Sequence, residues 1–257
     1  MNTLHLTCLG GCINKQPGVQ PNEHYHAVFA QNLSRLEPPI HVSVSIGAYL
    51  SIDRMVERAD QLMQANRPDL LCVYVRPFSL MPLHKLLIRY EKADKRAARA
   101  LHPCLFNRKM AWNPRLSQFQ TDWPFVFEPR SRFGLRDCNL LAGLILGLHS
   151  WARRYVLLQL DLLQTRCEKH GTRLIVMTPA QNPDSVMGNY LCERAFQAID
   201  RFCTEKGILM LNAHRFGLEY FEADQLHFIP EVHREMGEEL TGLVVWEIGG
   251  HRAMSLT

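Results

Sequence analysis

The sequence has no apolar run long enough to cross a membrane. Its longest such stretch, residues 140–148, is about half of the ~20 residues that a spanning helix needs. The first ten residues carry no basic leader, and their short apolar run resembles a strand more than a signal peptide. We therefore expect a soluble, cytoplasmic protein.

The chain also has little excess of either charge. It contains 29 Lys and Arg against 25 Asp and Glu, and the two kinds are interspersed. Nucleic-acid binding normally requires a basic patch or stripe, so we expect no nucleic-acid partner. No internal repeat or linker divides the 257 residues, and we expect a single domain over 1–257.

Cysteine pairs of the CxxC type are missing, although the chain has eight cysteines. A chain this long and apolar does not depend on disulfides, so most of these thiols are expected to be free and buried. His24 and His26 form an HxH string, but on a helix they would point to different faces. We expect no metal and no cofactor.

Short apolar runs alternate with longer segments of helical period, which is typical of a parallel sheet covered by helices on both faces. The predicted fold is α/β, with three αβα layers around a mostly parallel five-stranded sheet. Predicted strands lie at about 3–9, 41–46, 70–75, 173–177 and 208–212. Predicted helices lie at about 22–36, 51–66, 138–170, 190–206 and 230–246.

Two of these helices carry more detailed expectations. Ser51 is placed to cap the helix over 51–66. The helix over 138–170 has an apolar stripe that we expect to face the core. Its members are Leu141, Leu144, Ile145, Leu148, Trp151, Tyr155, Leu158 and Leu162.

The regular pattern breaks down in an insertion at about 77–136, which is rich in proline and aromatic residues. An insertion of this length in a compact domain is more often functional than not. It forms either a lid or substrate wall, or a partly helical excursion that packs on the sheet.

A thiol follows the first predicted strand in the string Gly10-Gly11-Cys12. Ligands bind at the carboxyl edge of open α/β sheets, and glycines allow close backbone approach there. Near the other end, Asp224 and His227 stand three residues apart after the last strand. An imidazole can accept the proton of a nucleophile while a carboxylate fixes its tautomer. A DxxH string alone is weak evidence, because Asp224 can equally cap a turn.

Taken together, these elements resemble the SGNH/GDSL hydrolase family. Residues 9–14, Leu-Gly-Gly-Cys-Ile-Asn, are similar to its first block, Leu-Gly-Asp-Ser-Ile-Thr, with Cys12 at the position of the nucleophilic serine. Gly47, after the second predicted strand, matches the glycine of the second block, and Asp224 with His227 matches the last block. The resemblance implies a Cys12, His227 and Asp224 triad, with the Cys12 and Gly47 amides stabilising the oxyanion.

The sequence departs from the family at two positions besides Cys12. Gly11 replaces the aspartate of the first block, and Arg76 stands where an asparagine donates to the oxyanion. Arg76 either supplies a charged donor, which favours a substrate with a carboxylate or phosphate, or forms a surface ion pair. Asn182 lies in a polar loop that either lines the substrate site or is an ordinary connection.

The leading hypothesis is an acyl-processing enzyme, an esterase, thioesterase or acyltransferase, that forms a thioester on Cys12. Its substrate would be a small-molecule or carrier-bound acyl compound. The alternative is an inactive protein that keeps the fold for ligand binding or as a scaffold. The sequence decides neither the acyl acceptor nor the oligomeric state.

Overall fold

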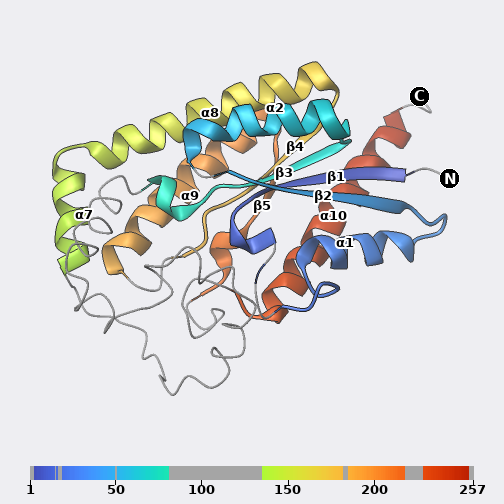
Figure 1. The fold of residues 1–257 in the computed structure, drawn as a ribbon, viewed down its shortest axis with the longest axis horizontal. Coiled ribbons are helices and arrows are strands. Elements are labelled where there is room, and N and C mark those ends of the chain that lie inside the picture. Colours follow the sequence, from blue (N-terminus) through green and yellow to red (C-terminus); the bar gives the residue numbers. More distant parts are fainter. Residues whose placement is uncertain are drawn as a thin grey trace.

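A computed structural model gives the structure of the chain, and it describes residues 3–14, 16, 19–49, 51–80, 135–181, 185–217 and 228–254. Five strands form one parallel sheet in the order β2-β1-β3-β4-β5 (Figure 1). They are β1 (Thr3–Gly10), β2 (His41–Ala48), β3 (Leu70–Tyr74), β4 (Arg173–Met177) and β5 (Leu209–Leu211). The predicted five-stranded α/β fold is confirmed.

Helices cover both faces of this sheet. Helices α1 (Tyr25–Ser34) and α10 (Pro230–Met254) pack on one face. Helices α2 (Met55–Asn66), α8 (Leu148–His170) and α9 (Val186–Lys206) pack on the other (Figure 1). Helix α7 (Leu135–Ile145) precedes α8. The 3-10 turns of the described residues are η1 (Cys12–Asn14), η2 (Ile52–Arg54), η3 (Pro77–Leu80) and η4 (Ala213–Arg215).

Alternate residues of each strand face opposite sides of the sheet, so a strand that is covered on both sides is apolar on both. In β1, Leu6 and Cys8 pack toward α1 and α10, whereas Leu9 packs toward α2. All five residues of β3 are buried. Continuous apolar strands are expected for a parallel sheet that is buried on both sides.

The predicted helix over 138–170 is two helices, which corrects the sequence reading. Gly147 adopts a left-handed conformation, with φ of 71°, between α7 and α8. Glycine reaches this region without the steric penalty of a side chain, so the chain can turn here. Ser51 also differs from its prediction, because it precedes η2 and its side chain makes no capping hydrogen bond.

The apolar stripe predicted as core on α8 is largely exposed. Trp151 is 61% exposed and Leu158 is 52% exposed, and their neighbour Ile145 on α7 is 78% exposed. The helix instead buries a parallel stripe one position further along, with Ala152, Val156, Leu160, Leu163 and Cys167. Both stripes have helical spacing, so the sequence did not distinguish them.

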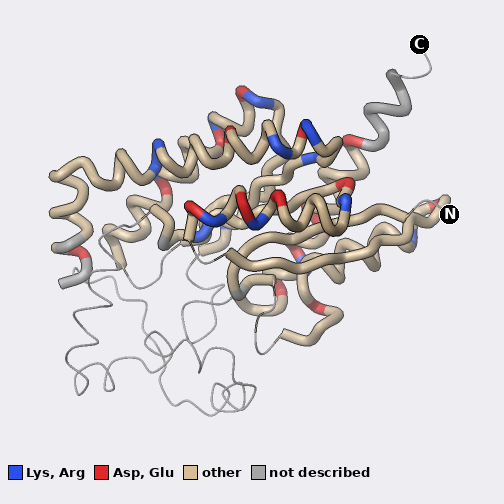
Figure 2. Tube along the Cα trace, turned by 45° about the horizontal axis from the view of Figure 1, so that its top comes forward, with Lys and Arg blue, Asp and Glu red and all other residues tan. Residues whose placement is uncertain are grey.

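Lys and Arg residues are interspersed with Asp and Glu residues along the described part of the chain, as Figure 2 shows. Among the described helices, none combines the length and hydropathy that a membrane crossing requires. Of the insertion predicted over 77–136, η3 and the start of α7 are described, and residues 81–134 lie outside the described part.

Candidate active site

The carboxyl ends of β1 and β3 are neighbours at the point where the chain changes sides. Helix α1 follows β1 on one face, whereas η3 and α8 follow β3 on the other. The strand order 2-1-3-4-5 places the ligand crevice of an open sheet at this switch point. Cys12 begins η1 just after β1, and Arg76 comes just after β3.

The turn after β1 is crowded on both sides by neighbouring residues. A Cβ atom on Gly10 would lie 3.0 Å from Tyr74 Cβ and 3.2 Å from Asn14 Nδ2. A Cβ atom on Gly11 would lie 3.2 Å from Arg76 Nε. Glycine at 10 and 11 therefore lets the chain pass close to the Tyr74 and Arg76 side chains, directly before Cys12.

Tyr49 holds Arg76 in this position. Arg76 Nη1 donates to the Tyr49 carbonyl oxygen at 3.1 Å, and the Arg76 backbone N–H donates to the Tyr49 hydroxyl at 3.3 Å. That hydroxyl donates in turn to the Tyr74 carbonyl oxygen at 2.7 Å. Burial raises the pKa of Tyr49 to about 12, so its hydroxyl stays protonated and neutral.

The guanidinium of Arg76 has no carboxylate partner within the described part of the chain. It is half-buried and next to Gly11, so the end of β3 carries a positive charge beside the Cys12 turn. The surface ion pair considered from the sequence is not formed with any described residue. Tyr49 was missed by sequence reasoning, because nothing in its local pattern signals a contact with Arg76.

Asn14 anchors the turn that Cys12 begins. Asn14 is buried, its Oδ1 accepts a 2.8 Å hydrogen bond from the Tyr25 hydroxyl, and its carbonyl oxygen lies 3.0 Å from His26 Nε2. Both partners belong to α1. The position of the turn is therefore fixed by buried polar contacts to the first helix, in addition to the strand that leads into it.

Gln16 links the segment after Cys12 to the segment after His227. Gln16 Nε2 donates to the Phe228 carbonyl oxygen at 2.5 Å, and Gln16 Oε1 lies 3.0 Å from His233 Nε2 on α10. Ile13 and Phe228 also belong to the same buried apolar cluster. Residues 212 positions apart in the chain thus meet beside the carboxyl edge of β1.

Several residues singled out from the sequence lie outside this description. Asp224, His227 and Asn182 are not among the described residues. The backbone of Cys12 is described, and it is the first residue of η1. The structure thus brings together the neighbours of the predicted triad, Ile13 and Gln16 on one side and Phe228 on the other.

Gly47 lies within β2, paired with Leu9, and not after the strand as predicted. A Cβ atom there would lie 2.5 Å from Leu62 Cδ1 of α2. The close packing of α2 on the strand therefore explains the glycine at this position. The ladder continues beyond it, because the Tyr49 N–H donates to the Gly10 carbonyl oxygen at 3.3 Å.

Three imidazoles form a buried group between α1 and α10. The rings of His24 and His26 are stacked with centroids 5.4 Å apart, and His24 meets His233 edge-on at 5.3 Å. The expectation that His24 and His26 face apart is wrong, because His24 is extended and precedes the helix. Burial first, and then the charge of His26, lower the pKa of His24 to about 4.

Burial makes the thiols of the described core unreactive. Cys8, Cys72, Cys167, Cys192 and Cys203 are buried and unpaired in disulfides, as predicted for most cysteines. Burial raises the pKa of Cys8 to about 12, so its thiolate is scarce near neutral pH. Cys138, in contrast, is exposed.

Comparison with known proteins gives a likeness in fold. No family model and no curated protein matches the sequence. Among solved structures, an acetylxylan esterase from Geobacillus stearothermophilus, crystallised as a catalytic mutant, matches with a TM-score of 0.55 and 12% identity. The match covers 97% of this chain and 96% of that one.

Two further structures agree with this likeness. A member of the lipolytic G-D-S-L family from Veillonella parvula has a TM-score of 0.52 and 9% identity, over 91% of this chain and 94% of that one. An α/β hydrolase from the metagenome of Lake Arreo, Spain, has a TM-score of 0.56 and 10% identity, over 95% and 96%. At such low identity these matches establish a shared fold.

Proposed function

We propose that this chain is an acyl-processing enzyme that acts on ester or thioester bonds through Cys12, His227 and Asp224. The hydrogen bond from Gln16 to Phe228 carries the proposal. It joins the segment four residues after Cys12 to the residue next to His227. The fold shared with lipolytic and esterase structures supports the same reaction class.

The reaction proceeds in two halves. The Cys12 sulfur attacks the carbonyl carbon while His227 accepts the thiol proton and Asp224 orients the imidazole. The tetrahedral intermediate collapses, the bond to the leaving oxygen or sulfur breaks, and His227 returns the proton to the leaving group. Water or another acceptor then attacks the thioester, with His227 as base, and the thiol is restored.

Arg76 is the proposed charged donor of the site. It stands at the switch point with no carboxylate partner among the described residues, and Tyr49 fixes its guanidinium over Gly11. The Cys12 amide stabilises the oxyanion. Gly47, the second backbone donor in the family pattern, is paired with Leu9 inside β2 and is not assigned that role. The free hydrogen-bonding capacity of Arg76 selects substrates with a carboxylate or phosphate near the reacting carbonyl.

Acyl trapping on Cys12 tests the nucleophile. Incubation with an activated ester should add one acyl group to the peptide that contains Cys12, detected by mass spectrometry. Cys12→Ala and His227→Ala should lower turnover by a factor on the order of 10³ or more. Cys138→Ser, which removes the exposed thiol, should leave turnover unchanged. Full activity of Cys12→Ala would refute the assignment.

Substrate charge tests Arg76 separately. Matched esters with a butyryl or a hemisuccinyl group have the same acyl chain length and differ in a terminal methyl group or carboxylate. We expect the wild-type protein to prefer the hemisuccinyl ester and Arg76→Gln to lose that preference. An unchanged ratio of kcat/KM in Arg76→Gln would remove Arg76 from substrate selection. Adding amine, alcohol and thiol acceptors to the same assay separates a hydrolase from an acyltransferase.

A protein without catalysis is the second candidate, and two observations favour it. Gly11 and Arg76 occupy positions where the family pattern has an aspartate and an asparagine. The rate of Cys12 alkylation against pH separates the candidates, because an imidazole partner lowers the pKa of a thiol. An alkylation rate equal to that of a free thiol and unaffected by His227→Ala would favour a binding or scaffold role.

A further inference from the structure

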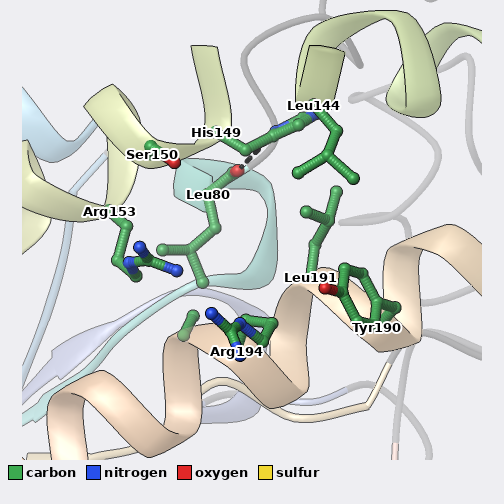
Figure 3. A pocket seen from close by; sticks show the side chains of 9 residues that line it. Leu80, Leu144, His149, Ser150, Arg153, Tyr190, Leu191 and Arg194 are labelled. Atoms are coloured by element: carbon green, nitrogen blue, oxygen red, sulfur yellow. Dashed lines mark hydrogen bonds between the residues drawn. The ribbon is translucent and has the colours of Figure 1, made fainter. Parts of the chain in front are cut away.

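A small cavity lies between η3, α8 and α9, beyond the carboxyl end of β3. Its volume is about 90 Å³, and its walls include Leu80, Leu144 and Tyr190. Figure 3 shows Arg153 reaching into this space from α8 and Arg194 from α9. The cavity does not include Gly11 or Arg76, so it is separate from the Cys12 turn.

The polar lining of the cavity consists of hydrogen-bond donors. Arg153 and Arg194 supply two guanidiniums, Ser150 and Tyr190 supply hydroxyls, and no Asp or Glu of the described residues lines the space. Within the described part of the chain neither arginine forms an ion pair. Arg166 on α8, in contrast, lies 3.8 Å from Asp60.

One wall of the cavity is held by a buried histidine. His149 has one ring nitrogen 3.2 Å from the Leu80 carbonyl oxygen and the other 2.8 Å from the Leu140 carbonyl oxygen (Figure 3 marks the first contact). His149 thereby connects η3, α7 and α8. Because these elements are tied together, the space between the two arginines is a built feature of the fold.

We propose that this cavity binds the phosphate group of a small organic molecule. Two guanidiniums that face one space repel each other, and a bound dianion turns that repulsion into attraction. The planar fork of arginine matches phosphate oxygens in pairs, and the hydroxyls supply further donors. The leucine side chains and Tyr190 form an apolar wall for the organic part of the ligand.

Calorimetric titration with inorganic phosphate and with butyl phosphate, at constant ionic strength, tests the proposal. Saturable binding should weaken about tenfold or more in Arg153→Gln and in Arg194→Gln. Arg154→Gln is the matched control, because Arg154 is the exposed neighbour on α8 and does not line the cavity. Its affinity should equal that of the wild-type protein.

The two ligands distinguish the source of the phosphate. Tighter binding of butyl phosphate identifies an organic phosphate ester, whereas equal or tighter binding of inorganic phosphate assigns the cavity to free phosphate. Absence of saturable binding would overturn the proposal, as would equal weakening in all three variants. Thermal unfolding of each variant checks that the fold is retained. Binding requires no turnover, so its failure and a failure of the Cys12 mechanism are distinguishable.

Discussion

The two faces of the sheet differ in how they serve the candidate site. Under α2, α8 and α9 the core is a broad apolar layer that includes Leu160 and Val176. Under α1 and α10 an apolar core of similar extent also borders buried polar residues. They are Asn14, Gln16, His24, His26 and His233.

This difference assigns different tasks to the two faces. Apolar packing is non-directional, so most of the first face stabilises the fold without fixing a particular loop. The buried polar contacts of His149 on that side hold η3 and α7, and not the turn after Cys12. Buried polar groups require partners with defined geometry, so the second face also fixes the turn after Cys12 and the segment at Phe228. Damage to the first face should lower stability alone. Damage to the second should lower activity as well.

The largest expected loss of stability comes from a substitution in the apolar core under α2, α8 and α9. Leu160→Ala removes a side chain that is 0% exposed, and we expect the free energy of unfolding to fall by about 4 kcal/mol. Activity per folded molecule should be unchanged. Urea unfolding gives the first quantity, and active-site titration with an activated ester gives the second.

Leu158 on the same helix provides the control. It is exposed, so Leu158→Ala should change the free energy of unfolding by less than about 0.5 kcal/mol. A loss in Leu158→Ala as large as that in Leu160→Ala would mean that α8 packs through the stripe first predicted from the sequence.

Leu158 and Leu160 show which part of the fold the sequence alone did not predict. Short apolar runs between segments of helical period were enough to predict a five-stranded, mostly parallel sheet, and a strand buried on both faces, such as β3, is apolar throughout. The side of α8 that faces the core was not predictable, because two parallel apolar stripes have the same helical spacing. Packing against the rest of the fold determines which stripe is buried. The turn at Gly147, which separates α7 from α8, was also not predicted.

The candidate site was predictable to a different degree. Glycine before Cys12 and the position of Arg76 after β3 were read from the sequence, and the switch point places both at one edge. Tyr49, Asn14 and Gln16 were not found. Their roles depend on partners far away in the chain, and single polar residues in loops give no periodic signal.

Substitution of Gln16, on the face under α1 and α10, should give the next largest loss of stability. Gln16→Ala removes the donor to the Phe228 carbonyl and the contact with His233 Nε2. Buried groups that lose a partner are destabilised, and we expect a loss of about 3 kcal/mol in the free energy of unfolding. Turnover should also fall, since the segment next to His227 is released.

Comparison with Leu160→Ala isolates the positioning role of Gln16. Both variants are assayed well below their unfolding midpoints, where the protein is folded. A lower kcat in Gln16→Ala, with KM unchanged, is the expected result, and Gln16→Glu should not recover it, because a carboxylate cannot donate to the Phe228 carbonyl oxygen. Equal kcat values for the two alanine variants would assign Gln16 to stability alone.

The pH dependence of stability tests the buried histidines between α1 and α10. The pKa of His24 is lowered to about 4 in the folded state from a usual 6.5, so below pH 6.5 the unfolded chain binds more protons at this residue. Stability should therefore fall as the pH drops from 6.5 to 4, by on the order of 2 kcal/mol from His24. Urea unfolding at stepped pH measures the loss.

His24→Gln should flatten this part of the curve, whereas His41→Gln should retain the wild-type slope, because His41 is exposed at the start of β2. If the curve of His24→Gln runs parallel to that of the wild-type protein, His24 does not contribute to acid destabilisation.

The smallest effect concerns a single hydroxyl. Tyr25→Phe removes the donor to Asn14 Oδ1 and should lower the free energy of unfolding by about 1 kcal/mol. A double-mutant cycle with Asn14→Ala should give a coupling energy of similar size. The same cycle measured on kcat should also be non-additive, because the hydroxyl acts on the Cys12 turn through Asn14. Additive effects on kcat would mean that the face under α1 and α10 stabilises the fold without positioning the site.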